Sequence, residues 1–301
     1  MRKIMRSTFG RLFNKNWMLA AILICGASVF TSCTADNADN PATPDLNVAE
    51  KIIGKWMTAD MYGQPAVTND KMVYNFISTT QAFLSASFSK HPEAGSPWIA
   101  IEEADVVVNG NRVTITCHPS QNSTSVQEFN ITSINDNELY ANAKITVKNN
   151  GHVVLSEEGP LRLVKVTVDY SADILGMWEG RMTSEQSVYG DVEDHRWEYM
   201  TDGTFNYFHK VDGQWQISDD DYADYFVDGN LLCTRWKNAG AGNEEHREWW
   251  EIESIKDGVM KWKALRQNAD GTTYTATFEM RKIDVSSEDE GNGIGDDIGF
   301  W

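Results

Sequence analysis

One short pattern occurs twice in this chain and constrains its fold more than any other feature. The stretch AEKIIGKWMTADM begins at Ala49, and SADILGMWEGRMT begins at Ser171. Each contains two aliphatic residues, a glycine, one variable residue and a tryptophan, and the two glycines, Gly54 and Gly176, lie 122 positions apart. Self-similarity at a fixed spacing indicates repeated structural units. The chain is therefore predicted to fold as two copies of one unit.

The likeness between the two halves extends beyond this opening. The stretch VVNGNRVTI from Val107 matches FVDGNLLCT from Phe226, and LRLVKV from Leu161 matches FEMRKI from Phe278. The offsets between matched stretches stay close to 120 residues. The repeat therefore defines a first domain over residues 49–168 and a second over residues 169–284.

Within each copy the pattern is that of antiparallel strands. Val113, Ile115 and Cys117 alternate with polar residues, which is typical of strands that bury one face. Asn-Gly and Asp-Gly pairs, which favour tight hairpins, occur at 109–110, 202–203, 228–229 and 257–258. No stretch after the N-terminal segment predicts an amphipathic helix of three turns. We expect an all-β fold of two tandem, small antiparallel up-and-down β-barrels, each able to be filled by side chains or to hold one ligand.

The glycine-x-tryptophan openings, followed by serial hairpins, resemble the lipocalin-like domains of bacterial lipoproteins, arranged in tandem. The resemblance covers residues 49–284 and implies that Trp56 and Trp178 plug the barrel floors. It also implies a late arginine lying over each tryptophan. Arg162 and Arg281 are the candidates, although they do not occupy matching positions in the two copies. The copies lack the long terminal helix of full-size lipocalins.

The N-terminal segment has the features of a secretion signal. Basic residues precede an apolar run from Trp17 to Phe30, and residues 1–32 are predicted to be a lipoprotein signal peptide. Small residues before Cys33 resemble a lipobox, which implies that Cys33 carries fatty acyl chains such as palmitate. An ordinary cleaved signal peptide with a stray cysteine is the alternative. Residues 33–48 would form a linker, and its acidic start predicts a protein anchored by lipid to the outer membrane, either in the inner leaflet or, exposed at the cell surface, in the outer leaflet.

Charge and cysteine content narrow the possible partners. Removal of residues 1–32 leaves 21 basic and 44 acidic residues, a net charge of −23. Such a chain repels phosphate backbones, so we expect a membrane attachment through lipid and no binding to nucleic acid.

Cys117 and Cys233 are predicted to be free, buried thiols. Residues 285–301 are expected to be an acidic, glycine-rich tail.

Catalytic signatures are absent from the sequence, and we expect neither enzymatic activity nor a cofactor or metal. The chain has no Gly-x-Ser-x-Gly, Cys-x-x-Cys or His-Glu-x-x-His motif. Acidic clusters with histidine at 191–195 and 244–246, and the acidic run at 218–221, are interpreted as solvated hairpin ends. A hydrolase that uses the carboxylates of residues 191–195 is a remote alternative.

Aromatic residues are the more informative signal. The second domain is much richer in tryptophan, and its inward-facing rings either fill the barrel as core or line a pocket that stacks on a sugar or apolar ligand. The candidate ligand contacts are Trp197, Tyr199, Tyr207, Trp250 and Trp262. Trp249 shares its strand face with charged residues, so we expect it to point outward as a candidate contact for a partner or glycan.

The repeat also predicts which barrel is emptier. Trp262 aligns with Ala141, so we expect the first domain to be emptier and the second to be plugged by rings. The predicted function is binding of a small apolar or glycan ligand. The alternative is a surface interaction or adhesion module with filled barrels and no small ligand.

Overall fold

The computed structural model describes residues 46–86, 100–183, 194–218, 220–238, 245–268 and 270–283. Its contacts divide the chain into two compact units. Among the described residues, unit 1 comprises 46–65, 72–86 and 100–165, and unit 2 comprises 66–71 and 166–283. The proposed signal peptide, Cys33 and the tail at 285–301 lie outside the described residues, as do Asp191, Glu193 and Glu244.

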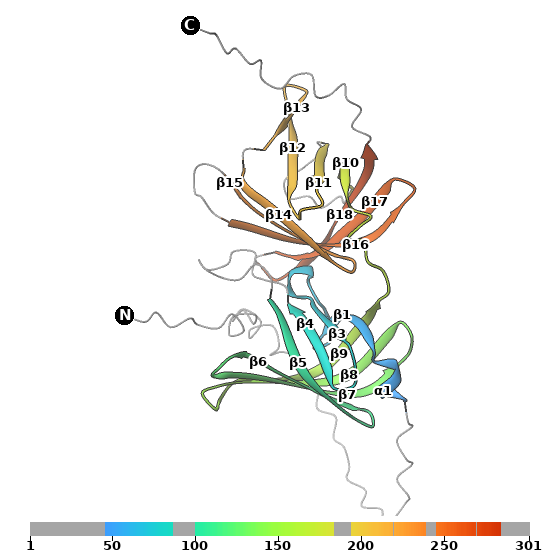
Figure 1. Cartoon of the computed structure of the whole chain (residues 1–301), viewed down its shortest axis with the longest axis vertical. Helices are drawn as coiled ribbons and strands as arrows, with labels where there is room; N and C mark the ends of the chain where they lie inside the picture. Colours follow the sequence, from blue (N-terminus) through green and yellow to red (C-terminus); the bar gives the residue numbers. More distant parts are fainter. Residues whose placement is uncertain are drawn as a thin grey trace, which may run out of the picture. The chain divides into compact units, whose positions relative to one another are not determined.

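Unit 1 is a closed antiparallel barrel (Figure 1). Its strands are β1 (Gly54–Met61), β2 (Gln64–Pro65), β3 (Met72–Phe76), β4 (Gln81–Ala86), β5 (Ala100–Asn109), β6 (Arg112–Ser120), β7 (Ser123–Ile134), β8 (Glu138–Asn149) and β9 (His152–Val166). Each strand from β3 to β8 pairs with the next along the chain, and β1 pairs with both β3 and β9. Eight strands therefore close the barrel, and β2 extends the hairpin of β1.

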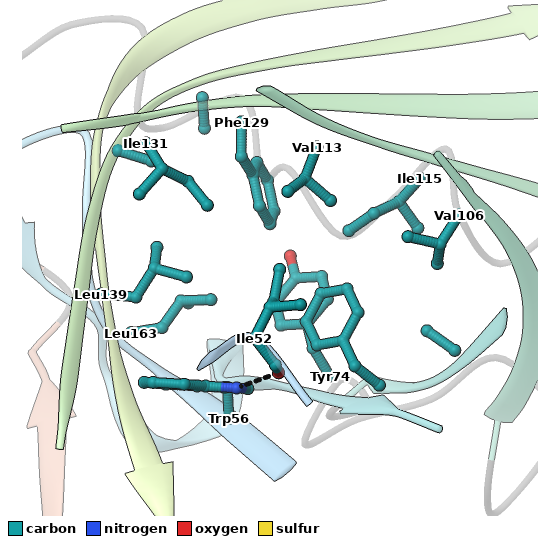
Figure 2. Packing of buried hydrophobic residues seen from close by; sticks show 14 of the residues in the cluster. Ile52, Trp56, Tyr74, Val106, Val113, Ile115, Phe129, Ile131, Leu139 and Leu163 are labelled. Carbon is teal, nitrogen blue, oxygen red and sulfur yellow. Dashed lines mark hydrogen bonds between the residues drawn. The ribbon is translucent and has the colours of Figure 1, made fainter. Parts of the chain in front are cut away.

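The interior of unit 1 is occupied by its own side chains. Alternate residues of the strands are buried, as at Val113, Ile115 and Cys117 of β6. Figure 2 shows Phe129 and Tyr74 projecting into the centre from opposite walls. The Tyr74 hydroxyl donates a hydrogen bond of 2.8 Å to Oε1 of Gln127, so these two polar groups of the core are paired with each other.

Unit 2 is a second curled antiparallel sheet (Figure 1). Its strands are β10 (Gly176–Met182), β11 (His195–Tyr199), β12 (Phe205–Val211), β13 (Gln214–Ile217), β14 (Asp220–Asp228), β15 (Leu231–Asn238), β16 (Glu245–Lys256), β17 (Val259–Gln267) and β18 (Thr273–Ile283). The strand order is β13-β12-β11-β10-β18-β17-β16-β15-β14. In the described part of unit 2, an isolated bridge between Thr204 and Asp224 links the β12 side of this sheet to β14.

The fold class predicted from the sequence is confirmed: the chain is all-β, with two up-and-down antiparallel sheets. The second sheet is curled and not closed by a full ladder. Helical structure in the described residues is limited to the four-residue α1 (Val48–Lys51) and a 3-10 turn at Thr68–Asp70. No helix in the described part of the chain has the length and apolar character needed to cross a bilayer.

The repeated glycine-x-tryptophan opening has the same geometry in both units. Trp56 and Trp178 are fully buried, and each donates its indole N–H to a backbone oxygen four residues earlier, Ile52 and Ile174, at 2.6 Å. Figure 2 shows this bond at Trp56. The tryptophan therefore buries a large ring while its single polar group remains satisfied.

The cation over each tryptophan is a lysine, so the expectation of an arginine at Arg162 or Arg281 is wrong. Lys165 and Lys282 lie with Nζ 4.9 and 5.2 Å from the ring centroids of Trp56 and Trp178. These lysines occupy aligned positions in LRLVKV and FEMRKI.

The two arginines are engaged elsewhere. Arg162 pairs with Asp60 and Glu138, and the Arg281 side chain is 71% exposed. Alternation along the strand explains the difference, because the lysine lies one residue after Arg281 and three after Arg162, on the face that meets the ring.

Cys117 and Cys233 are buried and form no disulfide bond with each other, as the sequence predicts. Cys117 belongs to the core of unit 1, and Cys233 lies on β15 of unit 2. Burial, together with the nearby Asp228, raises the pKa of the Cys233 thiol well above its usual value. A thiol that is both buried and protonated is unreactive until the strands around it open.

Candidate ligand-binding cavity in unit 2

Unit 2 encloses a cavity of about 330 Å³ on the inner face of its curled sheet. Its lining residues are Met182, His195, Trp197, Tyr199, Phe205, Tyr207, Ser218, Thr234, Trp236, Glu248, Trp250, Trp262 and Phe278. Cavities that bind small molecules have volumes from about 300 Å³ and mix apolar walls with a few polar groups. Both the size and the lining of this cavity fit that description.

The position of the cavity overturns the expectation that the first domain is emptier and the second is plugged. In unit 1, inward alanines such as Ala141 accompany a closed barrel whose centre is filled by Phe129 and Tyr74. In unit 2 the large rings pack against one another along the inner face of a sheet that is less closed than the barrel of unit 1. The number of rings therefore does not decide whether a barrel is filled, because wall spacing and ring packing also contribute.

Three of the rings form one continuous wall. Trp250 of β16 and Trp262 of β17 stack with centroids 5.5 Å apart and planes at 27°. Trp197 of β11 meets Trp262 edge-on, also at 5.5 Å, with planes at 84°. Such offset-stacked and edge-to-face contacts are the preferred arrangements of aromatic pairs. The rings thus support each other and present a preformed apolar surface.

A histidine and a tyrosine add polar groups to this wall. His195 Nδ1 and the Tyr207 hydroxyl lie 2.7 Å apart in a hydrogen bond. The His195 ring also lies 5.4 Å from Trp197, centroid to centroid. The sequence interpretation placed His195 in a solvated hairpin end, whereas the alternation of His195, Trp197 and Tyr199 along β11 was the signal that all three face inward.

Among the described lining residues, Glu248 supplies the one carboxylate, and the sequence interpretation also missed it. Glu248 precedes Trp250 by two residues on β16 and therefore shares its inward face. Its carboxylate lies 3.5 Å from a guanidinium nitrogen of Arg266 and 3.4 Å from the indole nitrogen of Trp250. The Arg266 guanidinium also lies over the Trp250 ring, 4.6 Å from its centroid.

The environment of Tyr199 reflects both the apolar walls and this carboxylate. Burial raises the pKa of the Tyr199 hydroxyl well above its usual value, and the nearby Tyr225 and Glu248 raise it further. Among the described residues, neither the Tyr199 hydroxyl nor the indole nitrogen of Trp262 has a hydrogen-bond partner. Two buried polar groups without a described partner therefore lie at this point, with the Glu248 carboxylate close by.

Five of the six predicted ligand contacts line the cavity, namely Trp197, Tyr199, Tyr207, Trp250 and Trp262. The outward exposure expected for Trp249 is wrong, because its side chain is only 1% exposed. Trp249 does lie on the opposite strand face from Trp250, but that face is covered.

The segment Ala66–Lys71, which belongs to unit 2, contributes to this cover. Lys71 Nζ pairs with Glu251 of β16 at 2.8 Å, and the Thr68 hydroxyl accepts a hydrogen bond from the Leu265 amide at 2.8 Å. A face that is charged in sequence can thus be buried when its charges find partners.

The remaining clusters of acid and histidine are engaged in ordinary contacts. Asp194 pairs with Arg181 at 2.7 Å and lies 3.6 Å from Lys210. His246 stacks on Trp236, with centroids 5.3 Å apart. Within the described ranges, no three histidine, cysteine or carboxylate side chains are grouped so that they could hold a metal ion.

Matches to known proteins are found among solved structures. No family model and no curated protein matches the chain. One similar solved structure is a protein of unknown function from the DUF3598 family of Nostoc punctiforme, with 10% identity, a TM-score of 0.25, and coverage of 80% of this chain and 99% of that chain.

A second similar structure is a double mutant of the vaccine antigen transferrin-binding protein B from Haemophilus parasuis. It has 8% identity and a TM-score of 0.21, and the match covers 73% of this chain and 61% of that protein. The chain therefore spans less than two thirds of that neighbour. Similarity at this level assigns neither a family nor a function to this chain.

Proposed function

We propose that the chain is a lipid-anchored protein of the cell envelope that binds a small molecule in the cavity of unit 2. The observation that carries the proposal is the cavity itself, about 330 Å³ in volume and lined mainly by aromatic rings. Aromatic walls with a few polar groups suit apolar groups, sugar rings and other compact ligands. The protein would act by binding, without catalysis and without a cofactor.

The anchor rests on the sequence. A basic and apolar N-terminal segment followed by small residues and Cys33 is the pattern of a lipoprotein signal. Multiple acyl chains on one cysteine hold a protein stably at a bilayer, whereas a single chain does so only weakly. The acidic residues after Cys33 favour the outer membrane, with the cell surface as the proposed location of the two units.

The alternative of a surface interaction module with filled barrels fits unit 1, whose core is occupied by its own side chains. It does not account for the cavity in unit 2. We therefore assign ligand binding to unit 2 and leave unit 1 without a small-molecule ligand in this proposal.

Native mass spectrometry of the protein purified from its own host tests the proposal. The wild-type chain is expected to carry a bound small molecule in addition to its lipid. Thr234→Phe, which adds a ring to the cavity lining, should abolish this extra mass. Val107→Phe adds the same ring at a position of unit 1 that is 62% exposed, and should leave it unchanged. A wild-type mass equal to that of the lipidated chain alone would contradict the proposal.

A further inference from the structure

We infer that the ligand of the unit 2 cavity is a small organic cation, whose ammonium group lies among the rings with Glu248 as its counter-ion. This inference rests on the proposed function and narrows the ligand to one chemical class. Three independent features of the molecule carry it: the charge of the lining, the faces of the rings, and the charge of the unit as a whole.

The charged group in the cavity lining is negative. Glu248 lines the cavity, and the described lining residues include neither lysine nor arginine. Arg266 approaches the carboxylate only to 3.5 Å, and the Glu248 side chain is 28% exposed. The carboxylate already contacts Arg266 and the Trp250 indole nitrogen, and an ionised carboxylate accepts about four hydrogen bonds, so a ligand ammonium would share it with these groups. A cationic ligand gains from this group, whereas an anionic ligand would be repelled by it.

The aromatic wall is suited to the same charge. Cations are attracted to the faces of tryptophan and tyrosine rings, most strongly where water is excluded. The structure already contains one such contact at this wall, because the Arg266 guanidinium lies 4.6 Å from the Trp250 centroid.

The net charges of the two halves of the sequence also favour a cationic ligand in unit 2. Residues 169–284 contain 24 acidic and 12 basic residues, a net charge of −12. Residues 49–168 contain 12 acidic and 9 basic residues, a net charge of −3. The cavity therefore lies in the strongly acidic half, and a net field of this sign raises the local concentration of cations and their association rate.

Two probes of nearly identical shape test the inference directly. Choline carries a trimethylammonium group, and 3,3-dimethyl-1-butanol replaces the charged nitrogen with carbon. Binding of each to the full mature chain in maltoside detergent is measured by isothermal titration calorimetry. We expect choline to bind at least tenfold more tightly, a difference of about 1.4 kcal/mol. Equal or tighter binding of the neutral alcohol would overturn the inference.

A pair of matched variants locates the effect. Glu248→Gln removes the charge from the cavity and should weaken choline binding at least tenfold while leaving the neutral alcohol unaffected. Glu253→Gln removes the same charge from the same strand, at an exposed position paired with Lys263 at 2.8 Å, and should change choline binding less than twofold. Equal losses in the two variants would show that general charge, and not Glu248, attracts the cation, and would overturn the inference.

Different experimental outcomes would contradict the inference and the proposed function. If neither probe binds, or if the neutral alcohol is preferred, the cation is wrong as the ligand class. The proposed function then still depends on whether host-purified protein carries a small molecule that Thr234→Phe removes. Near-ultraviolet circular dichroism of each variant shows whether the tryptophan-rich wall has kept its packing.

Discussion

The two glycines of the repeated opening allow a quantitative prediction. Gly54 and Gly176 have φ of +112° and +102°, a region that side-chain-bearing residues rarely adopt. Alanine at either position would store about 1–3 kcal/mol of backbone strain. A Cβ there would also lie 3.2 Å from Cε of Lys165 or Lys282. Since the end of a lysine side chain moves easily, this contact adds little to the strain.

The two buried thiols provide an assay that reports on each unit separately. Cys117 belongs to unit 1 and Cys233 to unit 2, and both are protected from solvent until the surrounding strands open. A loss of about 1–3 kcal/mol raises the population of the open form roughly 5- to 150-fold. Gly54→Ala should therefore accelerate thiol labelling at Cys117, and Gly176→Ala should accelerate it at Cys233, as measured by peptide mass spectrometry.

Within each variant the other thiol is the internal control. Unchanged labelling at the thiol of the mutated unit would show that the positive φ is not required there. An equal acceleration of both thiols in both variants would show that the two units unfold together. Either result would refute the view that each glycine-x-tryptophan opening stabilises its own unit.

Three further predictions concern single side chains. Lys282→Met should destabilise unit 2 by about 0.5–1 kcal/mol in thermal melts, because it removes the cation from Trp178, whereas the exposed Arg281→Met should have almost no effect. Tyr199→Phe should leave the melting temperature unchanged or raise it, because it removes a buried hydroxyl without a described partner; a fall would show that the hydroxyl is bonded. Cys33→Ala should release the protein from the membrane fraction, and retention there would contradict the lipid anchor.

Much of the fold could be predicted from local sequence signals. Alternation at Val113, Ile115 and Cys117 and the Asn-Gly and Asp-Gly turns identify strands and hairpins, because they depend only on neighbouring residues. The internal duplication predicted that two similar units follow each other along the chain. The closure of each sheet could not be predicted in the same way, because it depends on contacts between strands far apart in the chain, such as β1 with β9.

The candidate site was predicted only in part, for the same physical reason. Alternation along a strand was enough to place Trp197, Tyr199 and Trp250 on inward faces. It could not decide whether inward rings fill a barrel or line a cavity, because that depends on the spacing of the walls. It also could not show that Trp249, on an outward face, is covered within unit 2.

The lysines over Trp56 and Trp178 illustrate a missed signal. The aligned stretches LRLVKV and FEMRKI place Lys165 and Lys282 at the same position, and this match was available in the sequence. The resemblance to lipocalin-like domains led us to expect an arginine, although Arg162 and Arg281 do not align with each other in the two copies. Alignment of the two copies predicts the cation better, because a lysine at the same aligned position lies over the tryptophan in each unit.

The central claim, that unit 2 binds a small molecule in its cavity, is tested most directly by ¹⁹F NMR of the chain labelled with 5-fluorotryptophan. Single substitutions assign the resonances, and a small-molecule extract of the host's cell envelope is then added. The account predicts shifts for Trp197, Trp250 and Trp262, which line the cavity, and none for Trp56 and Trp178, which are fully buried and do not line it. Shifts confined to Trp56 and Trp178, or no shift at any ring, would contradict it.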